Sequence, residues 1–78
     1  MVTASQIRAA RALLSWNGAD LAQAAGLSLQ TIRRMESELG PGRSSAANVD
    51  AVRRALETKG VVFLGADEAG GPGVRLRS

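Results

Sequence analysis

Apolar residues recur at helical spacing through most of the first 59 positions, and the spacing changes after Gly60. Apolar positions three, four and seven residues apart mark the buried face of an amphipathic helix. This pattern predicts helices over about residues 5–15, 18–25 and 29–37, and from residue 46 or 49 to residue 59. The positions expected to face inward are Ile7, Ala10, Leu14, Leu21, Ala22, Ala25, Ile32, Met35, Val49, Val52 and Leu56. The chain is therefore expected to be mainly α-helical.

The ends of these helices carry residues that commonly start or stop a helix. Side chains of Ser, Thr and Asn accept the orphan backbone N–H groups of a first turn. The candidate caps, in chain order, are Thr3 or Ser5, then Asn17, Ser28, and Ser45 or Asn48. Gly26 supplies the left-handed backbone that ends the second helix. Residues 40–45 are rich in Gly, Pro and Ser and separate the third helix from the fourth.

The segment after Gly60 has the composition of β-strands. Residues 61–64 are β-branched, aromatic or aliphatic, and residues 74–77 alternate apolar and basic side chains. An isolated hairpin is marginal in water, so it either packs on the helices or pairs its edge with a second copy. We favour a sheet shared across a homodimer, with residues 1–59 as the helical domain and residues 60–78 as the dimerisation extension. The expected dimerisation residues are Val61, Val62, Phe63, Leu64, Val74 and Leu76.

The composition excludes several kinds of chemistry. The chain has 78 residues, the size of one domain, and contains no Cys and no His. Disulfides, thiolate or imidazole metal sites and Ser-His-Asp triads are therefore excluded. The carboxylates of Asp20, Glu57 and Asp67 form no pair at a spacing useful for acid–base catalysis. We expect no enzyme, no metal and no cofactor.

The charge of the chain points to a polyanionic partner. Ten basic residues against seven acidic ones give a net charge of +3, and every basic residue except Lys59 is Arg. The forked guanidinium pairs with phosphate oxygens and guanine edges better than an ammonium does. No stretch approaches the roughly 20 apolar residues of a membrane helix, and the first residues have no apolar run of signal-peptide length. We expect a soluble, cytoplasmic protein associated with the nucleoid, without a membrane partner.

Residues 18–37 predict a helix, a four-residue turn and a second helix. Ala22 must be small because the next helix crosses close above it, and Gly26 takes positive φ in the turn. The residues that would lock the two helices at a fixed angle are Leu21, Leu27, Ile32 and Met35. Such a corner leaves the outward face of residues 28–37 projecting, as a helix that enters a major groove does. A plain corner between two helices of a bundle is the alternative.

This stretch resembles the helix-turn-helix of the XRE family, the Cro and phage-repressor class of bacterial and phage regulators. The resemblance extends over residues 5–59 and includes Arg11 and Glu36. Family members often pair an arginine late in the first helix with a glutamate near the end of the recognition helix. The resemblance implies a four-helix, lambda-repressor-like fold in which this pair fixes the recognition helix and holds Arg11 near a phosphate.

The resemblance also implies which residues contact double-stranded DNA. The base-reading candidates are Leu29, Gln30, Arg33 and Arg34. Gln can bond adenine, Arg can bond guanine, and Leu can rest on a thymine methyl group. The phosphate-contact candidates are Arg11, Asn17, Gly18, Ser28, Arg43 and Ser44.

Position 18 departs from the family pattern. Family members commonly have Gln there, which touches a phosphate and braces a polar side chain on the recognition helix. Here position 18 is Gly, and Leu29 occupies a position where family members frequently have a polar residue that contacts a base. The two changes are compatible, since an apolar Leu29 requires no Gln partner. The backbone N–H of Gly18 is then expected to bind the phosphate.

We therefore expect a sequence-specific, DNA-binding transcriptional regulator, and a dimeric repressor on an inverted-repeat operator is the simplest mechanism. The helix over residues 28–37 would lie in the major groove. Activation of transcription stays open. The alternative is an antitoxin or another protein-interaction module with a helix-turn-helix core and a protein partner.

Overall fold

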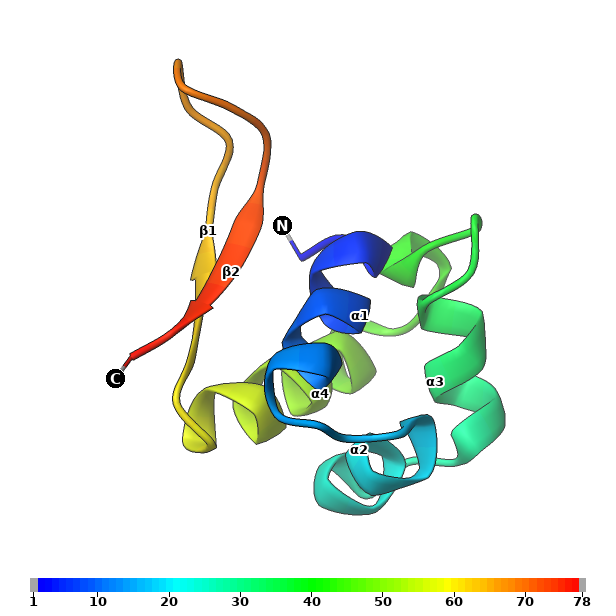
Figure 1. The fold of residues 1–78 in the computed structure, drawn as a ribbon. Helices are drawn as coiled ribbons and strands as arrows, with labels where there is room; N and C mark the ends of the chain where they lie inside the picture. Colours follow the sequence, from blue (N-terminus) through cyan, green and yellow to red (C-terminus); the bar gives the residue numbers. More distant parts are fainter. Residues whose placement is uncertain (1, 78) are drawn as a thin grey trace.

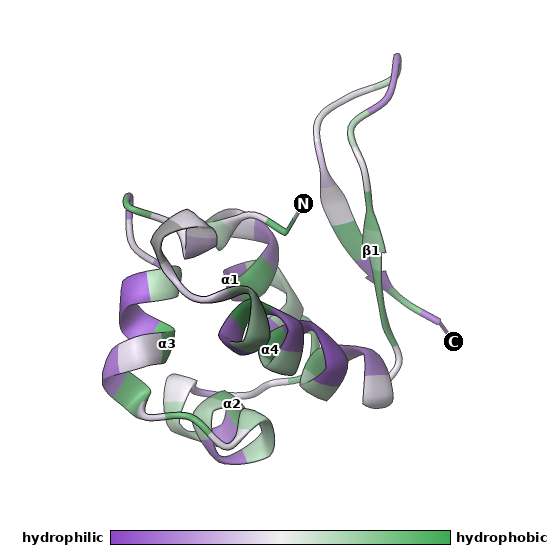
Figure 2. Ribbon diagram, turned by 180° about the vertical axis from the view of Figure 1, so that it is seen from behind, coloured by the Kyte–Doolittle hydropathy of each residue, from purple (hydrophilic) through white to green (hydrophobic). Residues whose placement is uncertain are grey.

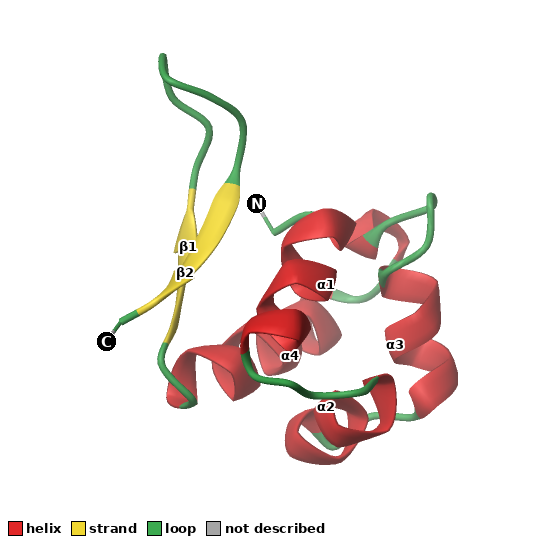
Figure 3. Cartoon of the chain, viewed as in Figure 1, coloured by secondary structure: helices red, strands yellow, loops and turns green. Residues whose placement is uncertain are grey.

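The computed structural model describes residues 2–77, and only the backbone of Arg43. Over this range the chain forms four α-helices, a short 3-10 helix and a two-stranded antiparallel hairpin (Figures 1 and 3). The elements are α1 (Ala4–Leu13), α2 (Gly18–Ala25), α3 (Leu29–Met35), η1 (Pro41–Arg43), α4 (Ala46–Thr58), β1 (Val61–Leu64) and β2 (Gly73–Leu76). The mainly α fold predicted from the sequence, with four helices and a C-terminal hairpin, is confirmed.

Each α-helix begins at a side chain that accepts a backbone N–H three residues further on. These caps are Thr3, Asn17, Ser28 and Ser45, so the two positions left open by the sequence resolve to Thr3 and Ser45. The bounds of α2 agree with the prediction, and Gly26 ends it with a φ of 71°. Local capping signals therefore set where the helices begin.

Helices α1 and α3 both end two residues earlier than predicted. Ser15 adopts a left-handed φ of 57°, which stops α1 at Leu13. After α3, the hydroxyl of Ser37 donates to the carbonyl of Arg34 at 2.6 Å and takes over an acceptor that a further helical turn would use. These endings depend on single side chains and backbone angles that hydrophobic spacing does not encode.

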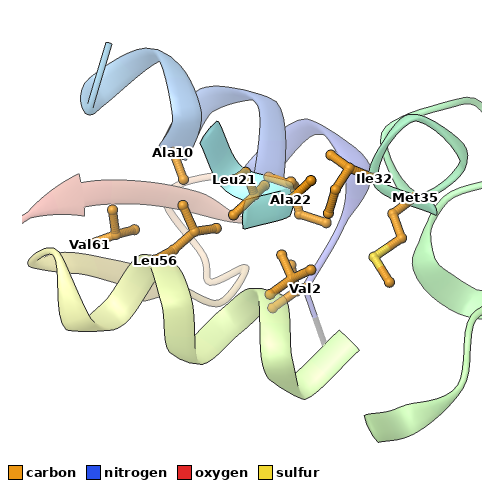
Figure 4. Packing of buried hydrophobic residues seen from close by; sticks show 10 residues of the cluster. Val2, Ala10, Leu21, Ala22, Ile32, Met35, Leu56 and Val61 are labelled. Atoms are coloured by element: carbon orange, nitrogen blue, oxygen red, sulfur yellow. The ribbon is translucent and has the colours of Figure 1, made fainter. Parts of the chain in front are cut away.

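The core is built from aliphatic side chains and one methionine, contributed by every α-helix, by β1 and by Val2. Its members are Val2, Ile7, Ala10, Leu21, Ala22, Ile32, Met35, Val52, Leu56 and Val61 (Figure 4). The remaining predicted inward positions, Leu14, Ala25 and Val49, are half-buried and pack against this core. The predicted apolar spacing is confirmed, and Val2 joins the core from outside the expected helices.

The hairpin packs on the helices of its own chain. Strand β1 pairs with β2 in the register Val61↔Leu76, and β2 runs from Gly73 to Leu76, one residue earlier than predicted. The side chain of Val61 is 1% exposed and belongs to the core, and Phe63 and Val74 pack against it. Of the residues assigned to dimerisation, Leu64 and Leu76 have exposed side chains, at 38% and 37%.

Gln6 fastens the hairpin to α1 through its side-chain amide. Its Nε2 donates to the carbonyl of Leu64 at 3.1 Å and to that of Gly73 at 2.9 Å, so it bridges both strands. Its Oε1 accepts the N–H of Thr3 at 2.9 Å, which completes the capping box of α1. The residue is 4% exposed, and the three bonds satisfy a polar group that would otherwise be costly to bury.

Candidate nucleic-acid interface

Helix α3 turns an apolar side inward and a basic side outward. Ile32 and Met35 are fully buried in the core, whereas Gln30, Arg33 and Arg34 are exposed. The exposed three are spaced three and four residues apart, so they form one continuous surface of the helix. The helix lies on the side of the molecule away from the hairpin (Figure 1). Most of the residues of α3 are hydrophilic (Figure 2). Three of the four predicted base-reading residues are thus exposed together.

Arg11 and Glu36 form the ion pair that the sequence predicts. Nε of Arg11 lies 2.6 Å from one carboxylate oxygen of Glu36, and Nη2 lies 2.8 Å from the other. Nη1 donates to the carbonyl of Trp16 at 3.1 Å, so Arg11 also supports the turn that precedes α2. The hydrogen bonds to Glu36 raise the pKa of Arg11 above its ordinary value. With the side chains 21% and 10% exposed, this pair fixes the end of α3 against α1.

Arg8 makes a second contact to the end of α3, which the sequence reasoning missed. Its Nη1 donates to the backbone carbonyl of Glu36, and its Nη2 donates to Ser5 Oγ at 3.1 Å. The carboxyl end of a helix carries partial negative charge, so a cation there is favourable. The signal available in the sequence was the spacing of Arg8 and Arg11, which places both on one side of α1.

A groove of about 370 Å³ lies between the starts of α2 and α3. It brings predicted phosphate-contact residues together with predicted base-reading residues, and its lining includes Arg11, Asn17, Gly18, Leu29 and Arg33. Gly18 is the first residue of α2, and Leu29 is the half-buried first residue of α3. Residues from three separate helical segments therefore border one hollow beside the basic surface of α3.

Three of the predicted phosphate-contact residues, Asn17, Ser28 and Ser44, also have structural roles in the fold. Asn17 Oδ1 accepts the N–H of Asp20 at 2.8 Å, and Ser28 Oγ accepts the N–H of Thr31 at 3.1 Å, so both act as helix caps. Ser44 follows η1, and its backbone N–H donates to the carbonyl of Pro41. The side chain of Arg43 lies outside the described part of the chain.

The basic residues of α3 differ from those of α4 in their partners. Arg53 and Arg54 each lie 2.5 Å from a carboxylate oxygen of Asp50, and hydrogen bonds from Arg53 and then Arg54 lower the pKa of that carboxyl. Arg33 and Arg34 form no ion pair with any side chain in the described range. Within the described residues, the positive charges of Arg33 and Arg34 are therefore not compensated by an ion pair.

The chain matches no family model, no curated protein and no solved structure. Between residues 2 and 77, no three His, Cys, Asp or Glu side chains gather where they could hold a metal ion. None of the helices in that same stretch combines the length and apolar character needed to cross a bilayer. Within the same residues, the outward side of α3 carries exposed Gln30, Arg33 and Arg34.

Proposed function

We propose that this protein is a sequence-specific double-stranded DNA-binding transcriptional regulator in which α2 and α3 act as a helix-turn-helix. Helix α3 enters the major groove. An α-helix with its side chains is about 10–12 Å across, close to the groove width of about 12 Å. The XRE-like pattern of residues 18–37 agrees with this role.

The observation that carries the proposal is the way α3 is held. Its inner side is buried, and Arg11 and Arg8 bind its carboxyl end, so the helix is rigidly presented. Its outer side carries Arg33 and Arg34 without carboxylate partners among the described residues. Gln30 can bond adenine, and an Arg can bond guanine O6 and N7 through two hydrogen bonds. Arg34, one turn after Gln30, is the first candidate for a guanine contact.

Phosphate binding by the groove residues supplies the salt-sensitive part of the affinity. The three bonds of Arg11 do not exhaust the donors of a guanidinium, so Arg11 can also bind a phosphate oxygen. Asn17 and Gly18, at the start of α2, line the same groove as Arg11, and the backbone N–H of Gly18 would bind a phosphate oxygen there. These contacts position the protein on the duplex, and α3 selects the sequence.

A finer part of the proposal is that two copies bind as a homodimer on an inverted repeat. A two-stranded sheet leaves one edge of each strand without a strand neighbour, and such edges pair readily with another chain. Exposed Leu64 and Leu76 add apolar surface to the hairpin. The two α3 helices would then lie about 34–36 Å apart, one turn of DNA, and repression would follow from occlusion of a promoter.

Selection of bound duplexes from a random pool tests the proposal, followed by affinity measurements on the selected site with Arg34→Ala. We expect enrichment of an inverted repeat. Loss of a guanine contact should weaken binding by about 1–3 kcal/mol and relax the choice at one base pair. The matched control is Arg54→Ala, which removes the same charge from an exposed position of α4.

The outcomes separate the possible roles. A uniform loss on all sequences would make Arg34 a phosphate contact instead of a base reader. If Arg34→Ala and Arg54→Ala changed the affinity for the selected duplex equally, α3 would not be part of the DNA interface. If no duplex is enriched at any salt concentration, the regulator proposal fails and a protein-interaction module is the better description.

A further inference from the structure

Gly18 is the one glycine in residues 2–77 whose missing side chain makes room for another side chain. An ideal Cβ on Gly18 would lie 2.9 Å from Cδ1 of Leu29, well inside the separation of about 3.5–4.0 Å at which carbon atoms pack. At the other glycines nothing lies within 4 Å of that position. The left-handed φ that favours glycine occurs at Gly26, Gly40 and Gly60, but not at the start of α2. Glycine at position 18 therefore serves a close contact and not a turn.

The contact fixes an apolar side chain at the start of α3. Leu29 rests on α2 at Gly18 and is only half-buried, so part of its surface stays open. The neighbouring outward residues of α3 are polar or basic, and Arg33 borders the same groove. Leu29 thus adds methyl groups to one end of a surface that otherwise offers hydrogen-bond donors and positive charge.

We propose that Gly18 determines base specificity through Leu29, whose methyl groups it allows to meet the C5-methyl group of a pyrimidine. The inference rests on the DNA-binding function proposed above. In the major groove the C5-methyl group marks thymine and accepts apolar contacts. The base 5-methylcytosine carries the same methyl group at the same ring position, so the recognised chemistry is a 5-methylpyrimidine. Gly18 is a positioning residue in this scheme, and Leu29 makes the contact.

Gly18→Ala should displace the side chain of Leu29 without destabilising the fold. Alanine is a better helix former than glycine, and its Cβ meets only the flexible far end of a leucine side chain. The helix is retained while Leu29 is displaced. Leu29→Ala removes Cδ1 itself, so adding Gly18→Ala to it should change binding no further.

The test uses the selected duplex, with each thymine replaced in turn by uracil and each cytosine by 5-methylcytosine. For the wild-type protein we expect one position in each half-site where removal of the methyl group weakens binding about fourfold, the ratio for burying one such group. Gly18→Ala and Leu29→Ala should reduce that ratio to below about twofold. Gly71→Ala, at an open position with ordinary φ, is the control and keeps the fourfold ratio.

The two substitution series distinguish the sources of the methyl group. A loss on replacing thymine with uracil identifies thymine, and a gain on replacing cytosine with 5-methylcytosine identifies methylated DNA. Wild-type binding that is insensitive to every such change, with the Arg34 dependence intact, would overturn this inference and leave the regulator proposal standing. A fourfold ratio retained by Gly18→Ala would overturn the role of Gly18. Should that variant fail to fold, methyl sensitivity retained by Leu29→Ala would overturn the inference.

Discussion

Replacing Gln6 with Met should loosen the hairpin from the helices. Methionine has a similar length and keeps the aliphatic part of the side chain, but it cannot donate to the carbonyls of Leu64 and Gly73. It also cannot accept the N–H of Thr3, so the capping box of α1 is lost. The substitution therefore removes three hydrogen bonds from a residue that is 4% exposed while changing little in volume.

The expected cost follows from those three bonds. A hydrogen bond contributes about 1 kcal/mol net, and a buried group left without a partner costs more. For the three bonds together we expect a loss of about 2–3 kcal/mol in the free energy of unfolding. A chain of 78 residues is stable by about 4–12 kcal/mol in all. The midpoint of thermal unfolding should fall by roughly 8–24 °C.

Urea and thermal unfolding, followed by circular dichroism, measure this change, and amide hydrogen exchange locates it. Exchange of the β1 amides should quicken more than exchange of the α2 amides. The matched control is Gln23→Met on the exposed surface of α2, which should change stability by less than about 0.5 kcal/mol. If Gln6→Met were as stable as this control, the bonds from Gln6 would not hold the hairpin.

Gln6→Glu should make the stability of the folded protein depend on pH. A buried carboxylate facing two carbonyl oxygens is unfavourable, so the pKa of this carboxyl in the folded protein should exceed the value of about 4.3 in the unfolded chain. A raised folded pKa means that the variant is most stable at acidic pH and loses stability as pH rises above about 4. Unfolding midpoints that do not vary between pH 4 and 7 would refute the burial of this group.

Two further predictions concern the ion pair and the hairpin. Glu36→Gln leaves the partly buried charge of Arg11 uncompensated and should cost about 1–2 kcal/mol in urea unfolding, whereas Glu57→Gln, at an exposed pair, should cost less than about 0.5 kcal/mol. Equal costs would show that the pair does not hold α3. Leu64→Lys should shift sedimentation from dimer to monomer, while Leu13→Lys, equally exposed on α1, should not. A wild-type protein that sediments as a monomer would refute the dimer.

Hairpin deletion would be a poor substitute for the Leu64 variant. The side chain of Val61 is part of the core, and Phe63 packs against it. A truncated chain would therefore lose stability along with any dimer contact, and its weak DNA binding would have two causes. A single exposed side chain changes the outer surface alone.

The sequence predicts those features that depend on neighbouring residues. Asn17 and Gly26 enclose α2 with a cap and a left-handed turn, and its bounds follow from them. The apolar spacing identifies the buried sides of α1, α3 and α4, because burial follows helical periodicity. The Arg11–Glu36 pair was predicted through the family resemblance, since the two residues lie 25 positions apart.

The features that were missed depend on distant parts of the chain. The pattern Thr3-x-x-Gln6 matches a capping box, but it does not reveal that the same amide reaches carbonyls 58 and 67 positions away. The contact of Arg8 with the carbonyl of Glu36 is likewise nonlocal. The packing of the hairpin on α1 could not be chosen over a shared sheet, because both satisfy the same alternation of side chains.

The order in which the ribosome makes these residues has a consequence for the newborn chain. Gln6 emerges long before Gly73, which lies 67 positions later, and synthesis at about 5–20 residues per second makes that interval roughly 3–13 seconds. Throughout this time its amide can be satisfied by water, and the place of Val61 in the core stays unfilled until β1 has been made. The domain therefore completes its folding only after all four helices and both strands have been synthesised.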